Sequence, residues 1–286
     1  MRRIGDSLVV PVAGQYRLYQ SVLTALLIGL CLSAHTVAFA STRVAAAVNS
    51  SSSLDAPVQA ANAIEQQCVV VVHGLARTSR AMKPLARAFE QAGYTVVNVD
   101  YPSRQHPVEY LAPLAIEELG ISQCGERETV HFVTHSLGGI LVRYYLAHNE
   151  IPADLPELGR VVMLAPPNKG SEVVDNYKKL PGFYFLNGPA GMQLGTDEQS
   201  IPSQLPAVNF DLGVIAGSRT FNPILSFFLP NPDDGKVSAE SARVDGMRDY
   251  LLLPVTHTFL MRSQEVIEQA IHYIQHGRFR RDSDNR

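Results

Sequence analysis

Short apolar runs recur along the central part of the chain, and segments of a different periodicity separate them. Several of these runs are apolar at every position instead of alternating with polar residues. A strand with this pattern has both faces covered, as strands of a parallel sheet do. The runs span residues 68–73, 95–100, 129–134, 160–165, 212–217 and 249–254.

The segments between the runs carry apolar residues at helical spacing. One stripe precedes Gly93 and another follows Gly139; their members are Met82, Leu85, Ala86 and Phe89, then Ile140, Leu141, Tyr144 and Tyr145. Helices that alternate with buried strands predict a doubly wound α/β fold with a mostly parallel sheet of six strands. In such sheets ligands bind beyond the carboxyl ends of the strands, so the residues directly after each run are the candidates for function.

The first forty residues follow a different pattern. Arginines precede an apolar run at 21–32, and Ala-Phe-Ala at 38–40 provides the small residues of a cleavage site. This pattern predicts a signal peptide in residues 1–40 and therefore a periplasmic or secreted protein. The alternative is an uncleaved membrane anchor at 22–40, because that stretch approaches the ~20 apolar residues that span a bilayer.

Composition limits the remaining choices. Segment 41–65 is rich in Ser and Ala and has no apolar period, so we expect a flexible lead-in, followed by one folded domain at 66–279 and a polar tail at 280–286. The formal net charge of -3 argues against a nucleic-acid partner. The sequence has no metal-ligand spacing and no dinucleotide-binding glycine motif, so we expect no cofactor.

The strongest chemical signal lies at 131–139, His-Phe-Val-Thr-His-Ser-Leu-Gly-Gly, where an apolar run meets a helix. A serine at this corner either caps the helix or acts as a nucleophile at the helix N-terminus. Thr134 to Gly138 resembles the nucleophile elbow of the α/β-hydrolases, which is normally Gly-x-Ser-x-Gly, with Ser136 as the nucleophile. The segment departs from the motif at Thr134, whose methyl group must fit against the following helix.

Two further loops resemble this family. Segment 69–79 is similar to the His-Gly loop that follows an early strand in its lipases and esterases, and segment 164–171 is similar to a pocket-lining segment. The resemblance implies that the backbone N–H groups of Leu75 and Leu137 form the oxyanion hole. It also implies that His73 supports the loop and is not a base.

The family order of catalytic residues is serine, then an acid, then histidine. The resemblance assigns the acid to Asp234, directly before Gly235, and the histidine to His257. Asp233 is the competing acid. Adjacent residues of an extended loop face opposite ways, so only one of the two carboxylates can face the imidazole, and we expect it to be Asp234.

These residues imply acyl chemistry. Ser136 would attack an acyl carbonyl, His257 would transfer the proton and Asp234 would hold the imidazole tautomer, which describes a serine hydrolase acting on carboxylic esters of acyl chains or lipids. An acyltransferase or a thioesterase would use the same triad. A non-catalytic binding protein on this scaffold, or an interaction protein anchored by its N-terminal segment, is the alternative of another class.

Two features limit the architecture within the family. The Ser- and Ala-rich segment occupies the place of two additional strands, so we expect the small, six-stranded form, and only 166–206 leaves room for a cap, which is therefore minimal. The apolar group within it, residues 183–186, either lines an acyl groove or packs on the sheet.

Signal-peptide cleavage would leave Cys68 and Cys124, an even pair in an exported protein. Cys68 begins one predicted strand, and Cys124 comes just before the strand that leads to Ser136. The resemblance implies that these two strands are parallel neighbours, so both thiols should lie at the same end of the sheet. The sequence leaves two possibilities, a disulfide or two buried free thiols.

Overall fold

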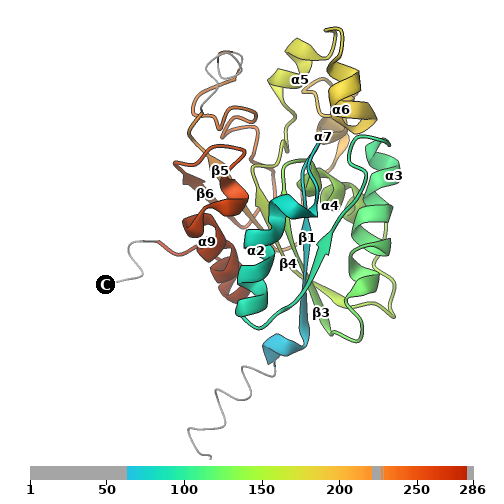
Figure 1. The fold of residues 1–286 in the computed structure, drawn as a ribbon, viewed down its shortest axis with the longest axis vertical. Coiled ribbons are helices and arrows are strands. Elements are labelled where there is room, and N and C mark those ends of the chain that lie inside the picture. Colours follow the sequence, from blue (N-terminus) through green and yellow to red (C-terminus); the bar gives the residue numbers. More distant parts are fainter. Residues whose placement is uncertain (1–62, 221–226, 228, 282–286) are drawn as a thin grey trace, which may run out of the picture. The chain divides into compact units, whose positions relative to one another are not determined.

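A six-stranded sheet organises the computed structural model, which describes residues 63–220, 227 and 229–281 (Figure 1). All strand pairs are parallel, and the strand order is β2-β1-β3-β4-β5-β6. The strands are β1 (Gln67–Val72), β2 (Thr95–Val99), β3 (Thr129–His135), β4 (Glu157–Leu164), β5 (Leu212–Gly217) and β6 (Asp249–Leu253). The predicted signal peptide, most of segment 41–65 and the end of the polar tail lie outside the described residues.

The sequence prediction of a doubly wound α/β fold with six parallel strands is confirmed. The largest boundary difference is at β4, which begins at Glu157 and not at Arg160. Glu157 pairs with Thr129, and a register shift separates this pair from the Phe132–Val161 pair. The additional residues, Glu157, Leu158 and Gly159, lie at the less buried amino end of the strand and do not form a continuous apolar run, so the pattern did not indicate them.

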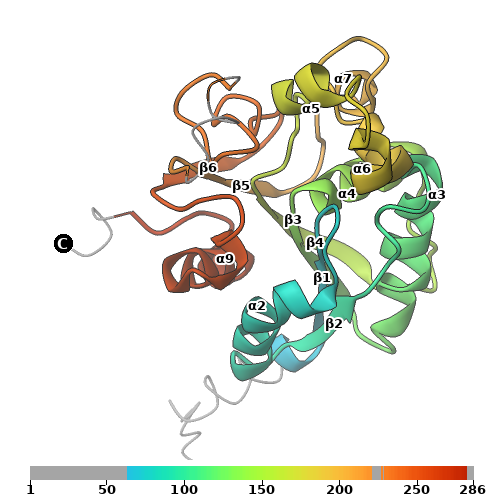
Figure 2. The ribbon, with the colours of Figure 1, turned by 45° about the horizontal axis from the view of Figure 1, so that its top comes forward.

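Helices cover both faces of the sheet (Figures 1 and 2). One face packs against α2 (Ser79–Gln91) and α9 (Gln264–His276), and the other against α3 (Val108–Pro113) and α4 (Leu137–His148). In β1, Val69 and Val71 pack on the face that α2 and α9 cover, and Val70 and Val72 pack on the face that α3 and α4 cover. Because successive side chains of a strand point to opposite faces, two covered faces require an uninterrupted apolar run.

A small cap follows β4. It consists of α5 (Glu172–Tyr177), α6 (Phe183–Met192) and α7 (Ile201–Gln204), which lie beyond the carboxyl ends of the strands (Figure 1). Shorter helical segments include η1 (Leu114–Glu118), η2 (Ile121–Gln123) and η3 (Leu260–Arg262). Within the described residues, no helical segment has the combined length and hydropathy of a transmembrane helix.

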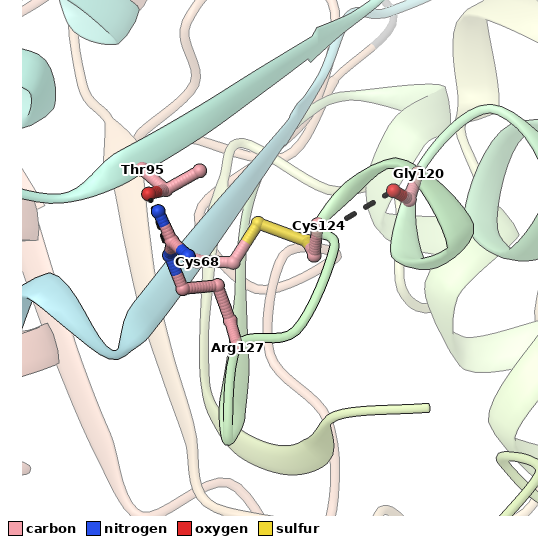
Figure 3. Close-up of a disulfide and its surroundings, with 5 residues drawn as sticks. All are labelled: Cys68, Thr95, Gly120, Cys124 and Arg127. Atoms are coloured by element: carbon pink, nitrogen blue, oxygen red, sulfur yellow. Dashed lines mark hydrogen bonds between the residues drawn. A yellow bond between two sulfur atoms is a disulfide. The ribbon is translucent and has the colours of Figure 1, made fainter. Parts of the chain in front are cut away.

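A disulfide joins Cys68 to Cys124, the first of the two possibilities that the sequence left open (Figure 3). The two Cα atoms are 5.8 Å apart and the residues are separated by 56 positions. Cys68 lies at the amino end of β1, and Cys124 follows η2 in the connection that leads to β3. The bridge therefore links the start of β1 to the segment that leads into β3, at the amino ends of the strands and away from the cap.

Candidate active site

Ser136 occupies the sharp turn between β3 and α4. Its backbone has φ 53° and ψ −120°, a conformation that costs a residue with a side chain about 1–3 kcal/mol. Two hydrogen bonds hold the turn: the Ser136 N–H donates to the Leu164 carbonyl at 2.9 Å, and the Gly139 N–H donates to the Ser136 carbonyl at 3.0 Å. The serine side chain remains partly exposed at the carboxyl edge of the sheet.

Glycines allow three chain segments to meet at this turn. A Cβ atom on Gly138 would lie 2.7 Å from the Val72 carbonyl oxygen, and one on Gly74 would lie 2.9 Å from the Ser136 Cβ. Thr134, the residue that departs from the family motif, is fully buried and its Oγ1 has no hydrogen-bond partner. Threonine therefore fits at this position with its hydroxyl unsatisfied.

Asp234 and His257 form a buried hydrogen-bonded pair. The His257 Nδ1 lies 2.8 Å from the Asp234 Oδ2, and the two side chains are 5% and 1% exposed. The other carboxylate oxygen accepts backbone N–H groups of Lys236 and Val237 at 3.0 and 2.9 Å, and the His257 N–H donates to the Asp234 carbonyl. A carboxylate held on both oxygens favours the tautomer with the proton on Nδ1, which leaves Nε2 able to accept a proton.

The neighbouring acid has a different partner. The Asp233 Oδ1 accepts the Gly235 backbone N–H at 2.7 Å, and Gly235 turns the chain at φ 95°. The structure therefore places the Asp234 carboxylate, and not that of Asp233, against the His257 ring.

The loop that contains Leu75 is held by His73. This buried ring stacks on Tyr101 with the centroids 4.2 Å apart, and its Nε2 lies 3.3 Å from the Tyr101 backbone N. The Tyr101 hydroxyl donates to the His73 carbonyl at 2.8 Å. Burial lowers the pKa of His73, which favours a neutral supporting side chain. Leu137, the second backbone donor expected, is the first residue of α4, where N–H groups have no acceptor within the helix.

Ser136 and His257 line one pocket of about 370 Å³ beneath the cap. Its apolar lining comes from the β1–α2 loop, the cap and the loop before β6: Leu75, Val173, Val174, Tyr177, Phe183, Leu186, Leu194 and Val237. Within α6, Phe183 and Leu186 line this pocket, and Tyr184 and Phe185 do not. Phe183 is partly buried, whereas Tyr184, Phe185 and Leu186 are 60%, 84% and 60% exposed. Residues 183–186 therefore do not act as one group: two of them line the pocket and two do not, so neither the acyl-groove nor the sheet-packing interpretation describes all four.

His135 also belongs to this site, although sequence reasoning gave it no role. Its Nε2 lies 3.0 Å from the His257 carbonyl oxygen, and the two imidazole rings are 4.7 Å apart. Burial, followed by the charge of His257, holds the pKa of His135 well below its usual range. The position of a histidine directly before the serine was the only available signal, and it did not indicate this contact.

No group of three or more histidine, cysteine, aspartate or glutamate side chains is arranged to hold a metal ion in the described part of the chain. The arrangement of a strained serine, a buried acid–histidine pair and the N-terminus of α4 directly after the serine is suited to attack on a carbonyl carbon.

Comparison with known proteins gives the same fold. Residues 69–268 match the sequence profile of the "Alpha/beta hydrolase family". The mature lipase BlEst2 of Bacillus licheniformis is similar in structure, with a TM-score of 0.57 and 20% identity over 72% of this chain and 91% of that one. Phospholipase PlaB of Legionella pneumophila in complex with thio-NAD has a TM-score of 0.55 and 18% identity, over 72% of this chain and 56% of that one. The metagenomic carboxyl esterase MGS0156 has a TM-score of 0.51 and 19% identity, over 68% of this chain and 65% of that one. No curated protein sequence matches the chain.

Proposed function

Because this chain belongs to the alpha/beta hydrolase family, we propose that it is a serine hydrolase that cleaves carboxylic esters of acyl chains or lipids. The observation that supports this most directly is the Asp234–His257 hydrogen bond, since His257 lines one pocket with a serine held in a strained turn. A lipase, a phospholipase and a carboxyl esterase among the proteins of similar fold agree with an ester substrate.

The proposed reaction begins at Ser136. Its Oγ attacks the acyl carbonyl while the His257 Nε2 accepts the hydroxyl proton, and Asp234 stabilises the imidazolium that results. The backbone N–H groups of Leu75 and Leu137 stabilise the oxyanion, and each such donor contributes a factor on the order of 10²–10³ to kcat. His257 then protonates the leaving alcohol, and water releases the acid from the acyl-enzyme in a second round.

The pocket supports an apolar acyl chain. Its volume of about 370 Å³ and its lining of aliphatic and aromatic side chains favour burial of a short to medium chain over a large rigid ligand. The cap contributes part of this lining, so chain-length preference depends on α5 and α6.

A fluorophosphonate probe tests the proposed nucleophile. We expect it to label the wild-type protein and not Ser136→Ala, and we expect ester hydrolysis to disappear in the same variant while its circular dichroism spectrum is retained. Loss of a partly exposed hydroxyl removes little stability, so misfolding would not explain the result. Equal labelling of the two proteins would reject Ser136.

We also propose that the protein is exported and acts in the periplasm or outside the cell. The Cys68–Cys124 disulfide supports this location, because disulfides persist in oxidising compartments. We expect the mature chain to begin at Ser41. N-terminal sequencing of the protein from its native host measures this, and a mature chain that retains residues 1–40 would favour the anchor.

A further inference from the structure

Two cationic side chains line the pocket that contains Ser136 and His257. Arg77 comes from the loop after β1, two residues beyond Leu75. Lys236 comes from the loop after β5, two residues beyond Asp234. These loops are far apart in the sequence, and the parallel sheet brings both to the same edge.

Neither side chain has an acidic partner there. The Lys236 backbone is bonded at both ends, since its N–H donates to the Asp234 Oδ1 and its carbonyl accepts the Ser171 hydroxyl. In residues 63–220, 227 and 229–281, neither the Lys236 ammonium nor the Arg77 guanidinium forms a hydrogen bond or an ion pair. The nearest acid in the same loop, Asp234, is already bonded to His257.

The charge of Arg77 acts on Lys236, and both cations act on His135. Loss of water around the ammonium group lowers the pKa of Lys236, and the positive charge of Arg77 lowers this pKa further. The negative charge of Asp234 acts in the opposite direction. Both cations also contribute to the low pKa of His135. Like charges that converge in a pocket destabilise the empty protein, and an anion bound between them would remove this repulsion.

We propose that Arg77 and Lys236 form an anion subsite of the hydrolase pocket, and that the substrate is an amphiphilic ester with a phosphate or carboxylate group close to the scissile bond. The inference rests on the proposed ester hydrolysis and specifies its substrate class. The acyl chain would occupy the apolar part of the pocket. Arginine presents a planar fork that matches two oxygens of an oxyanion, and lysine adds a compact charge.

A different role for the same charges predicts a different result. If Arg77 and Lys236 only stabilised negative charge that develops on any ester in the transition state, neutral and anionic substrates would benefit equally. The ratio of kcat/KM between an anionic ester and a neutral ester with the same acyl chain therefore isolates the subsite.

The first experiment uses a 1-acylglycerol and its 3-phosphate, as monomers at low ionic strength. We expect the wild-type protein to prefer the phosphate ester by about tenfold or more in kcat/KM, and we expect added salt to reduce this preference. Lys236→Met and Arg77→Gln should each bring the ratio toward one. Lys83→Met and Arg87→Gln, matched changes of exposed cations on α2, should leave it as in the wild type.

A second experiment uses the wild-type protein alone, so that a variant that fails to fold does not remove the test. An alkyl phosphate and a fatty carboxylate of equal chain length are compared as competitive inhibitors of a neutral chromogenic ester, with the corresponding alcohol as reference. We expect at least one anion to inhibit about tenfold more strongly than the alcohol. The stronger of the two identifies phosphate or carboxylate as the group recognised.

Hydrolysis of both esters with equal kcat/KM, together with equal inhibition by anions and alcohol, would overturn the anion subsite and leave ester hydrolysis intact. A fall in kcat/KM by the same factor for both esters in Lys236→Met and Arg77→Gln would also overturn it. Failure to hydrolyse either ester, with no probe label on Ser136, would instead overturn the proposed function, and the subsite with it.

Discussion

Adjacent residues at this site have different hydrogen-bond partners. Ser136 is held in its strained conformation by donating a hydrogen bond to Leu164 of β4 and by accepting one from Gly139 in the first turn of α4. Asp234 and Asp233 are adjacent in one loop, yet their carboxylates have different partners. Side-chain alternation predicted that only one of the two acids faces the imidazole, and the resemblance to the hydrolase family was needed to choose Asp234. The sequence gave no information on His135, because the His135–His257 contact joins the end of β3 to the loop after β6, and only the folded sheet brings these together.

The two adjacent acids should differ sharply in catalysis. Asp234→Asn removes the acceptor that holds the His257 tautomer, so we expect kcat for ester hydrolysis to fall on the order of 10⁴-fold. Asp233→Asn alters a turn and should keep kcat within about tenfold. Steady-state kinetics of both variants, with melting temperatures as the folding control, make the comparison. The reverse ranking would assign the acid role to Asp233.

Among the elements, the strands were easier to predict than the cap. Burial on both faces makes each strand an apolar run that local sequence reveals, whereas the helices α5 to α7 are short and depend on contacts with the sheet edge. Residues 183–186 illustrate this difference. An apolar tetrapeptide does not indicate which side of a helix faces a pocket, and only the position of α6 shows that Phe183 and Leu186 face it.

The division of α6 into a pocket side and an outer side predicts different effects of truncation. Phe183→Ala removes apolar contact with an acyl chain, so we expect kcat/KM for long-chain esters to fall about tenfold relative to acetyl esters. Phe185→Ala, on the 84% exposed position, should keep the profile of the wild type. A panel of model esters of increasing chain length measures both variants. Identical profiles for all three proteins would show that the acyl chain binds elsewhere.

At the scale of the whole molecule, the disulfide and the candidate site lie at opposite edges of one sheet. Cys68 pairs in register with Val130 near the amino ends of β1 and β3, whereas Ser136 follows the carboxyl end of β3. The bridge therefore stabilises the scaffold without contacting the pocket.

Removal of the bridge should lower stability more than activity. A loop of this length predicts a loss of about 4 kcal/mol in the free energy of unfolding as an upper figure from chain entropy. We expect Cys68→Ala/Cys124→Ala to unfold at lower urea concentration than the wild type and to retain kcat/KM within about threefold at a temperature where it is folded. Reductant should destabilise the wild type and leave the double variant unchanged. Equal urea midpoints for the two proteins would show that the bridge contributes no stability.

The strand order also determines when, during synthesis or refolding, the proposed catalytic residues come together. Ser136, the proposed nucleophile, follows β3, an interior strand, whereas His257, the proposed base, follows β6, which is an edge strand and the last strand of the sheet in chain order. On the proposed mechanism, a growing chain that has already produced Ser136 still lacks its general base, and a chain truncated before β6 never obtains one. If Ser136 and His257 have these roles, the proposed site is complete only after β6 joins the sheet, and we expect the onset of ester hydrolysis during refolding to report the addition of this strand.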